Sequence, residues 1–414
     1  MDKSIIILGA STLQLPLIKY IKSRGYNVIV VSIPGLYPGF SLADKCIYCD
    51  VRDVNAILNE VRNDEVIAVL TDETDIAVPA VALLNKALGL SGNDPITAEA
   101  YSNKYLMRQR CIEVGVHVPR FFRASTVSDI KSKSSQIIFP VVIKPEDSQG
   151  SRGVYMVNNV EQISEFFEKS VAFSKTKKVI VEEYFQGKEF VVEGFVQNGE
   201  YLNFGIGERK YFNLDGLFIP SQTLFPSKLS EDKQRLLLDA ERKLHHYLNP
   251  SFGMIHSEYL VNEDTNDYIL VETALRGGGV YISSHLVPLY CGINNYKMLL
   301  DCALGHGIDM DHIEREEREA SSGYVCFTLP EGDITSIQGV EDVKKMDSVV
   351  AFDLDGLTVG KHVEKMINKT QRLGPIIVKA NNRTDLELQI IKIQETLRIE
   401  VITSKGDVQN IVWN

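Results

Sequence analysis

The sequence predicts an α/β protein whose amino-terminal part is a parallel sheet with helical connections. Apolar runs at residues 4–8 and 27–32 fit buried strands, and the segment between them fits a helix that runs through Lys22. Such strand–helix–strand alternation gives a parallel sheet with right-handed crossovers. A further strand at 66–71 and a helix at 76–88 complete a Rossmann-like domain over residues 1–95. From residue 98 the pattern changes, and the rest of the chain mixes helices with short strands.

The composition is that of an ordinary folded protein. The 414 residues include 44 basic and 55 acidic side chains, for a net charge of −11, and 44% are hydrophobic. At about 100–200 residues per domain, this length predicts two to four domains. The negative charge argues against nucleic acid or an anionic membrane as a partner, because no basic stripe could neutralise several phosphates. An anionic ligand must therefore be held by a local pocket.

The apolar runs of the sequence are too short to predict a secretory signal or a membrane-spanning segment. The apolar run that starts at Ile5 ends at Leu8, which is too short for a secretory signal, and no later run approaches about 18 apolar residues. Six cysteines in a chain of this length show no disulfide or zinc pattern. We therefore expect a reduced, cytoplasmic protein.

The turn after the first strand lacks the chemistry of a dinucleotide site. Such a site needs three glycines in the pattern G-x-G-x-x-G and an acidic residue at the end of the second strand. Here only Gly9 is present, and the second strand ends in Ser32 and Ile33. We therefore interpret the amino-terminal domain as a scaffold.

The rest of the chain divides into predicted helices and short strands. Helices are expected at 98–114, 160–169, 231–248 and 386–397. Strands are expected at 140–144, 154–157, 179–183, 189–197, 201–208, 257–262, 268–273, 323–329 and 374–379.

The first chemically informative segment is a buried strand that ends in Lys144 and leads into a glycine-rich loop. The loop contains Ser148, Gly150, Ser151 and Gly153. Small residues let backbone N–H groups approach an anion closely, and the lysine adds a positive charge at the end of the strand. The segment is thus interpreted as a flap over nucleotide phosphates; a plain hairpin turn with a surface lysine is the alternative.

The second segment is an acidic hinge between two apolar strands. It contains Glu182, Glu183, Phe185 and, after Gly187, Glu189. Exposed backbone at a hinge can pair with a purine edge, and a carboxylate can accept both ribose hydroxyls. A solvated charged loop is the alternative.

The third segment is a hairpin that is expected to bring two glutamates together. With the turn centred on Thr265, Glu258 faces Glu272 and Leu260 faces Leu270. Facing side chains on one sheet surface have Cβ atoms about 4.5–5.5 Å apart. Two carboxylates at that separation need a proton or a cation, and hard oxygen ligands beside a phosphate suit Mg²⁺. Two exposed glutamates at the strand ends are the alternative.

An arginine and a run of three glycines follow the hairpin. Arg276 could stabilise a transferring phosphoryl group or hold a substrate carboxylate, and backbone donors in 277–279 could reach the same molecule. A surface arginine beside a flexible loop is the alternative.

In their order, these segments resemble the ATP-grasp superfamily over about residues 1–310. With the tail at 323–397, the layout is most similar to the biotin-carboxylase-like and carbamoyl-phosphate-synthetase-like branch, and within it to L-amino-acid ligases. The resemblance implies a Rossmann-like domain (1–95), a small ATP-grasp lobe with the flap (96–185), a large lobe with the metal site (186–318) and a carboxy-terminal α+β portion (319–414).

The resemblance also implies roles for individual residues. It assigns ATP binding to Lys104, Lys144, Ser148, Gly150, Ser151, Gly153, Glu182, Glu183, Phe185 and Glu189. It assigns Mg²⁺, with Mn²⁺ as a second choice, to Glu258 and Glu272, and catalysis to Arg276 and Lys144. Many members have an asparagine two positions after the second glutamate, where this chain has Ala274, which puts a second metal in doubt.

The implied reaction is ATP-dependent joining of a carboxylate to an amine through an acyl phosphate, with release of ADP and phosphate. Small-molecule substrates such as amino acids are the expected partners, and homodimers are common in this branch. Arg276, Gly278, Lys210, Ser283 and His285 are expected to line the substrate side. The alternatives are a ligase of amino-sugar or purine-like metabolism and a non-catalytic ATP-binding regulatory protein.

Overall fold

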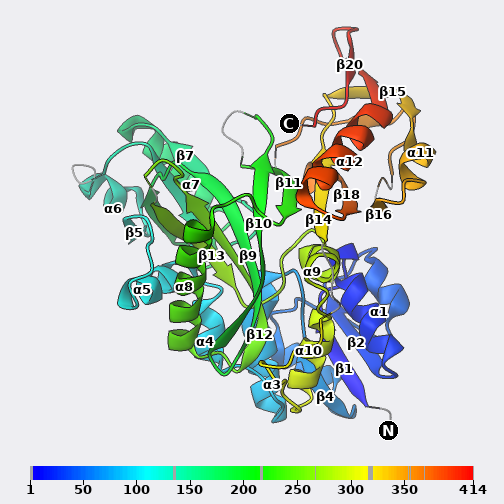
Figure 1. Ribbon diagram of the computed structural model, residues 1–414. Coiled ribbons are helices and arrows are strands. Elements are labelled where there is room, and N and C mark those ends of the chain that lie inside the picture. Colours follow the sequence, from blue (N-terminus) through cyan, green and yellow to red (C-terminus); the bar gives the residue numbers. More distant parts are fainter. Residues whose placement is uncertain are drawn as a thin grey trace.

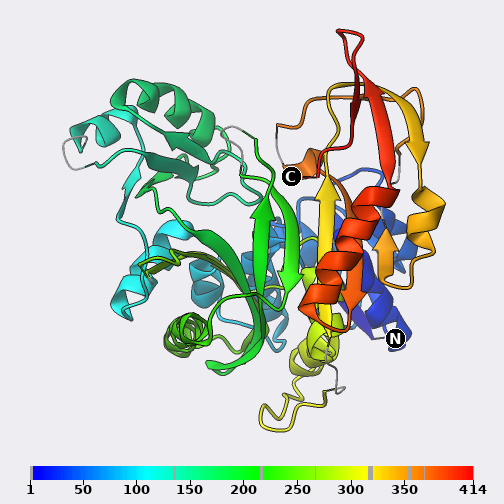
Figure 2. The same cartoon turned by 45° about the horizontal axis from the view of Figure 1, so that its top comes forward.

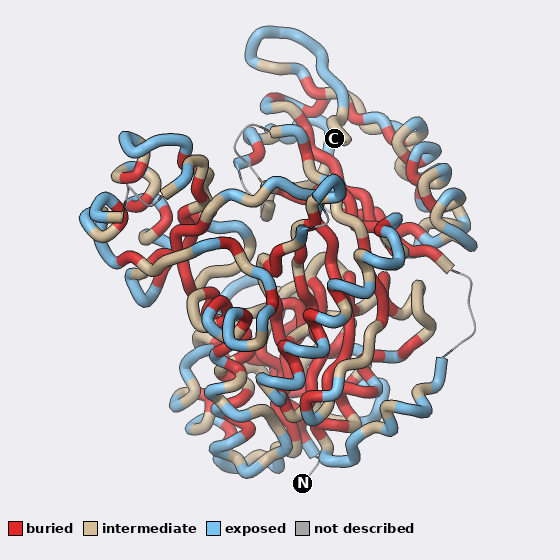
Figure 3. Tube along the Cα trace, turned by 60° about the vertical axis from the view of Figure 1, so that its left-hand side comes forward, coloured by how far each residue is buried: buried red, intermediate tan, exposed pale blue. Residues whose placement is uncertain are grey.

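The computed structural model describes residues 3–133, 137–214, 218–265, 267–315, 320–352, 354, 356–367 and 369–413. Over these residues it confirms an α/β fold, with four sheets and helices packed against them (Figure 1). The burial pattern in Figure 3 shows buried backbone running through the central sheet, with exposed segments at the periphery.

The amino-terminal sheet is parallel, as the sequence predicts. Its strand order is β3-β2-β1-β4, with β1 at Ser4–Leu8, β2 at Asn27–Ser32, β3 at Lys45–Tyr48 and β4 at Val66–Leu70. The connecting helices are α1 (Leu15–Ser23), α2 (Val54–Glu60) and α3 (Val78–Leu88). Every residue of β1 is buried, because both faces of a parallel sheet are covered by helices.

The predicted helix at 98–114 is in fact two helices. They are α4 (Pro95–Ala100) and α5 (Lys104–Glu113), and Asn103 between them caps α5 by accepting hydrogen bonds from the backbone N–H groups of Tyr105 and Leu106. An asparagine side chain in this position competes with the helical backbone and starts a new helix. Lys104 consequently occupies the first turn of α5 and is buried.

A second, antiparallel sheet carries the glycine-rich loop. Its order is β5-β8-β6-β7, with β5 at Phe121–Ala124, β6 at Val141–Pro145, β7 at Tyr155–Val157 and β8 at Val179–Glu183. Helices α6 (Val127–Ser132) and α7 (Ile163–Val171) pack on this sheet, which stands above one end of the central sheet in Figure 1. The loop between β6 and β7 therefore projects from the edge of this small sheet.

The central sheet joins strands from two regions of the chain, in the order β13-β12-β9-β10-β11-β14-β18-β16. Its strands are β9 (Lys188–Gln197), β10 (Glu200–Tyr211), β11 (Pro220–Phe225), β12 (Phe252–Val261), β13 (Tyr268–Ala274), β14 (Ser321–Phe327), β16 (Val349–Phe352) and β18 (Leu373–Ala380). Helices α8 (Glu231–Leu248), α9 (Val287–Cys291) and α10 (Asn295–Ala303) adjoin it. Pairing of β11 with β14 makes the carboxy-terminal portion continuous with the large lobe (Figure 2).

The carboxy-terminal portion adds one more sheet, in the order β17-β15-β19-β20. These strands are β15 (Gly332–Gln338), β17 (His362–Val363), β19 (Arg398–Ile402) and β20 (Val408–Asn410), and α11 (Val340–Lys344) and α12 (Arg383–Thr396) accompany them. The expected boundary between residues 318 and 319 lies outside the described residues, and the four domain limits stay predictions.

Candidate active site

A cavity of about 460 Å³ lies where the small sheet, its glycine-rich loop and the central sheet meet. Most of the residues predicted for ATP, metal and catalysis line it: Lys104, Lys144, Ser148, Gly150, Ser151, Glu182, Glu183, Phe185, Glu189, Glu258, Glu272 and Arg276. They come from positions almost 175 residues apart in sequence, between α5 and the segment after β13. Gly153 does not line the cavity; a Cβ there would meet Pro145, so this glycine serves close packing at the base of the loop.

The two glutamates of the hairpin face one another across β12 and β13, as the sequence predicts. The expected pairing of Leu260 with Leu270 is wrong, because Leu260 pairs with Ile269. A bulge after the Glu258–Glu272 pair accounts for the difference, since Val271 is the extra residue on β13. Its carbonyl instead accepts a hydrogen bond of 2.6 Å from Arg108 Nη2.

Glu258 is neutralised by an arginine from β10, which lies two strands away from β12 in the central sheet. Arg209 Nη1 lies 2.6 Å from Glu258 Oε1 and also contacts Glu189. Although burial opposes it, the Arg209 guanidinium together with His256 holds the pKa of Glu258 well below its ordinary value. Glu189 accepts a further hydrogen bond from Tyr211, yet burial raises the pKa of its carboxyl to about 7.

Glu272 has its own cation. Lys104 Nζ donates to Glu272 Oε1 at 2.8 Å and to the carbonyl of Ser148 in the loop, also at 2.8 Å. Despite burial, this carboxylate raises the pKa of Lys104, so the ammonium stays charged. The facing glutamates are therefore each balanced by a separate cation, rather than by a proton or an ion shared between them.

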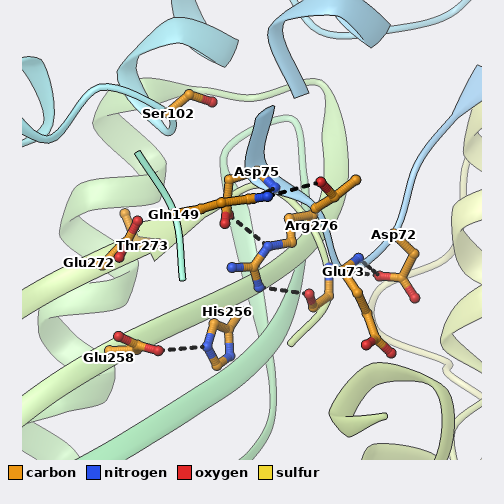
Figure 4. A network of polar contacts seen from close by, with 12 residues as sticks. Asp72, Glu73, Asp75, Ser102, Gln149, His256, Glu258, Glu272, Thr273 and Arg276 are labelled. Carbon is orange, nitrogen blue, oxygen red and sulfur yellow. Dashed lines mark hydrogen bonds and ion pairs between the residues drawn. The ribbon is translucent and has the colours of Figure 1, made fainter. Parts of the chain in front are cut away.

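Arg276 is anchored by the amino-terminal domain. Its Nε donates to Asp75 Oδ1 at 2.7 Å, and its Nη1 donates to the carbonyl of Gly277 at 2.7 Å (Figure 4). The backbone N–H of Asp75 in turn donates to Gln149 Oε1 of the glycine-rich loop at 2.8 Å. One acidic residue thus connects the loop, the amino-terminal domain and the arginine of the cavity.

Glu182 is held in a buried cluster of charges. Arg108 Nε lies 2.7 Å from one of its oxygens and Lys144 Nζ lies 2.6 Å from the other. Burial alone would raise the pKa of Glu182, but the two cations lower it to about 2. Burial also lowers the pKa of Lys144, and Glu182 opposes this effect. Both oxygens of the Glu182 carboxylate are therefore paired with protein cations. In this structure the hinge would have to contact a nucleotide base through other groups nearby.

The residues expected on the substrate side, Arg276 excepted, lie elsewhere. Lys210 is exposed and outside the cavity, because it alternates along β10 with Arg209 and Tyr211, which do line it. Ser283 is buried and donates to Asp72 Oδ2 at 2.7 Å, and His285 pairs with the adjacent Ser284. All three residues thus lie outside the lining of this cavity, and their role toward a substrate stays a prediction.

The glycine run serves packing more than ligand binding. The N–H of Gly277 donates to Asp72 Oδ1 at 3.2 Å, so this expected substrate donor is already engaged. A Cβ on Gly278 would lie 2.7 Å from Glu193 Oε1 and 2.9 Å from His256 Nδ1. Gly278 also lies outside the cavity lining. It allows the chain to pass close to a buried acid–histidine pair beneath the site.

Five charged residues of the cavity were given no individual role from the sequence: Asp75, Arg108, Arg152, Arg209 and Lys369. Arg108 lies one helical turn after Lys104, so the i, i+4 spacing could have identified it. Arg209 could have been found from the Asn198-Gly199 turn, which joins β9 to β10 and brings it near Glu189. Asp75 and Lys369 reach the cavity only through domain packing, for which the sequence carries no local signal.

The arrangement can hold a polyanion beside an oxygen-ligand cation site, since two facing carboxylates and several buried cations line one cavity. Comparisons with known proteins agree. A model of the ATP-grasp domain matches residues 137–284, and one of the L-amino acid ligase C-terminal domain 2 matches residues 325–401. Among the helices that the structure describes, none has the length and apolar character needed to cross a membrane.

Relatives and solved structures extend this result. Alanine–anticapsin ligase from Bacillus amyloliquefaciens is 22% identical over 368 residues, covering 80% of this chain and 76% of that protein. The crystal structure of L-amino acid ligase from Bacillus licheniformis has a TM-score of 0.79 at 20% identity, covering 96% of this chain and 98% of that one. Phosphoribosylglycinamide synthetase from Anaerococcus prevotii has a TM-score of 0.75 at 20% identity, with coverage of 96% and 99%. Together these findings show an ATP-grasp fold, with an ATP-grasp domain at residues 137–284 and an L-amino acid ligase C-terminal domain 2 at residues 325–401.

Proposed function

We propose that this protein is an ATP-dependent carboxylate–amine ligase that acts on an amino acid or a similar small carboxylate and releases ADP and phosphate. The facing pair Glu258 and Glu272, in one cavity with Lys104, Lys144 and Arg276, is the observation that carries the proposal. Two carboxylates and several cations in one enclosed site suit a reaction in which one anion must approach another.

The donor set fits a magnesium ion. Glu258 and Glu272 supply hard oxygen ligands from neighbouring strands, and Mg²⁺ in nucleotide sites takes one or two carboxylates together with phosphate oxygens. When bound there, the ion would offset part of the phosphate charge. Lys104 and Arg209, which now neutralise these carboxylates, lie close enough to turn toward phosphate oxygens once the ion takes over that task.

The chemistry proceeds in two displacements. A carboxylate oxygen of the first substrate attacks the γ-phosphorus of ATP, the bond to the ADP oxygen breaks, and an acyl phosphate forms. The amine of the second substrate then attacks the acyl carbon, loses a proton, and phosphate leaves. Lys144 and Arg276 stabilise the negative charge that gathers on the transferring group.

Glutamate-to-glutamine variants test the site. E258Q and E272Q should stay folded and lose ADP release by about 100-fold or more, because each removes one charged metal ligand. E263Q is the matched control, since Glu263 lies in the loop of the same hairpin and is exposed. ADP release at the wild-type rate in both site variants would contradict the metal assignment.

The substrate class needs a separate assay. Amino acids, singly and in pairs, are screened for stimulated release of ADP and phosphate, with L-alanine first because a curated relative is an alanine–anticapsin ligase. The expected result is stimulation by a pair, with a product of the summed mass less one water. Binding of ATP without stimulation by any amino acid would argue against an amino-acid substrate.

A further inference from the structure

Lys369 brings a positive charge into the cavity from the carboxy-terminal portion. It lies in a short helical turn, Lys369–Gln371, directly before β18, and it lines the cavity together with Glu258 and Asp75. Its side chain also meets the glycine-rich loop, because a Cβ added at Gly150 would lie 2.9 Å from Lys369 Cε and 3.6 Å from its Nζ. The lysine therefore lies beside the loop that is proposed to cover the phosphates.

The surroundings of Lys369, which is half-buried, differ from those of the other buried or half-buried cations in the cavity. Each of those has a carboxylate partner: Lys104 with Glu272, Lys144 and Arg108 with Glu182, Arg209 with Glu258, and Arg276 with Asp75. Within the described part of the chain, no carboxylate lies within ion-pair distance of Lys369.

The balance of nearby charge makes this site receptive to an anion. Burial lowers the pKa of Lys369 to about 8, and the attraction of Glu258 is countered by Arg372 and Arg209. A cation that has lost hydration without gaining a partner has the most to gain from an anionic ligand. The contact with Gly150 means that such a ligand would lie next to the loop when it binds.

We propose that Lys369 binds the reacting oxygen anion in the cavity, which is either the γ-phosphoryl group of the nucleotide or the carboxylate that attacks it. The inference rests on the proposed function for the identity of these anions. It adds a cation from the region matched by the L-amino acid ligase C-terminal domain 2 to the residues that touch the reactants.

Binding measurements with two nucleotides separate the two anions. K369M keeps the length of the side chain and removes its charge, K369R keeps the charge, and K365M is the control because Lys365 is exposed on the same segment. If Lys369 contacts the γ-phosphoryl group, K369M should weaken the binding of Mg²⁺–AMP-PNP by about ten-fold or more and leave the affinity for Mg²⁺–ADP unchanged. If Lys369 contacts the carboxylate, K369M should bind both nucleotides with wild-type affinity, and its KM for L-alanine should rise by about ten-fold or more.

Either pattern supports the proposal when K369R restores at least part of the loss. The proposal would be overturned if K369M bound ADP and AMP-PNP more weakly by the same factor. It would also be overturned if K369M and K365M had the same nucleotide affinities and the same KM for L-alanine. An unfolding temperature of unliganded K369M below that of K365M would indicate a structural role and would also overturn it. If wild-type protein releases no ADP with any amino acid, the proposed function fails, and the nucleotide pair alone decides the role of Lys369.

Discussion

Replacing Glu182 by glutamine should destabilise the small lobe strongly, because it leaves two buried cations without their counter-charge. Glu182 is 4% exposed and lies within 2.7 Å of both Arg108 and Lys144. The fall of its pKa from the ordinary 4.5 to about 2 corresponds to about 3 kcal/mol, at about 1.4 kcal/mol for each pKa unit. Removing one partner of a buried ion pair typically costs about 3–5 kcal/mol, which agrees with this magnitude.

Urea unfolding at two pH values measures this effect. The control is E168Q, since Glu168 is an exposed glutamate on α7 of the same lobe. Because the folded pKa of Glu182 lies below its unfolded value, its stabilisation is full above pH 4.5 and is lost as the pH falls toward 2. The free energy of unfolding of E182Q should thus lie below that of wild type by about 3 kcal/mol at pH 7 and by about 1 kcal/mol at pH 3. A gap at pH 7 within about 0.5 kcal/mol of that for E168Q would refute the reasoning.

Two further predictions concern the base of the cavity. G278A should lower the free energy of unfolding by about 1–3 kcal/mol, because its Cβ would crowd Glu193 and His256, whereas G279A should change it little since open space surrounds that position. Equal urea midpoints for the two variants would contradict this packing argument. Glu189, whose pKa is raised to about 7, stabilises the fold fully below pH 4.5 and loses that contribution as the pH rises to about 7. Between pH 4.5 and 8 the free energy of unfolding of wild type should therefore fall by up to about 3 kcal/mol relative to that of E189Q. If the two proteins changed in stability with pH in parallel, the role of Glu189 would be contradicted.

Local patterns predicted the reactive residues well where a single element carries them. The strands at 4–8 and 27–32 form as expected because long apolar runs are buried on both faces of a parallel sheet. The facing of Glu258 and Glu272 followed from hairpin pairing alone. The pairing of Leu260 was missed because a bulge leaves Val271 unpaired, and its carbonyl accepts a hydrogen bond from Arg108, a residue more than 160 positions away.

The substrate side shows the opposite case. The sequence suggested that the Ser283 hydroxyl could contact a substrate. In the structure it donates a hydrogen bond to Asp72, an acid of the amino-terminal domain. Lys210 and its neighbour Arg209 are both basic, and only the alternation of β10 decides which of them faces the cavity. A polar residue in a loop can serve either a ligand or another domain, and residue type alone does not separate the two.

The sequence by itself determined the order of most strands and helices in the chain and the places of Lys104, Lys144, Glu258 and Glu272 in the cavity. These features depend on short-range periodicity and on spacing within one hairpin or loop. Only the tertiary structure decided which cation neutralises which carboxylate, and that Asp75 and Lys369 join the cavity from opposite ends of the chain. The reason is physical: charge pairing in a buried site depends on distances of a few ångströms between separate sheets, and such distances are set by packing rather than by any local pattern.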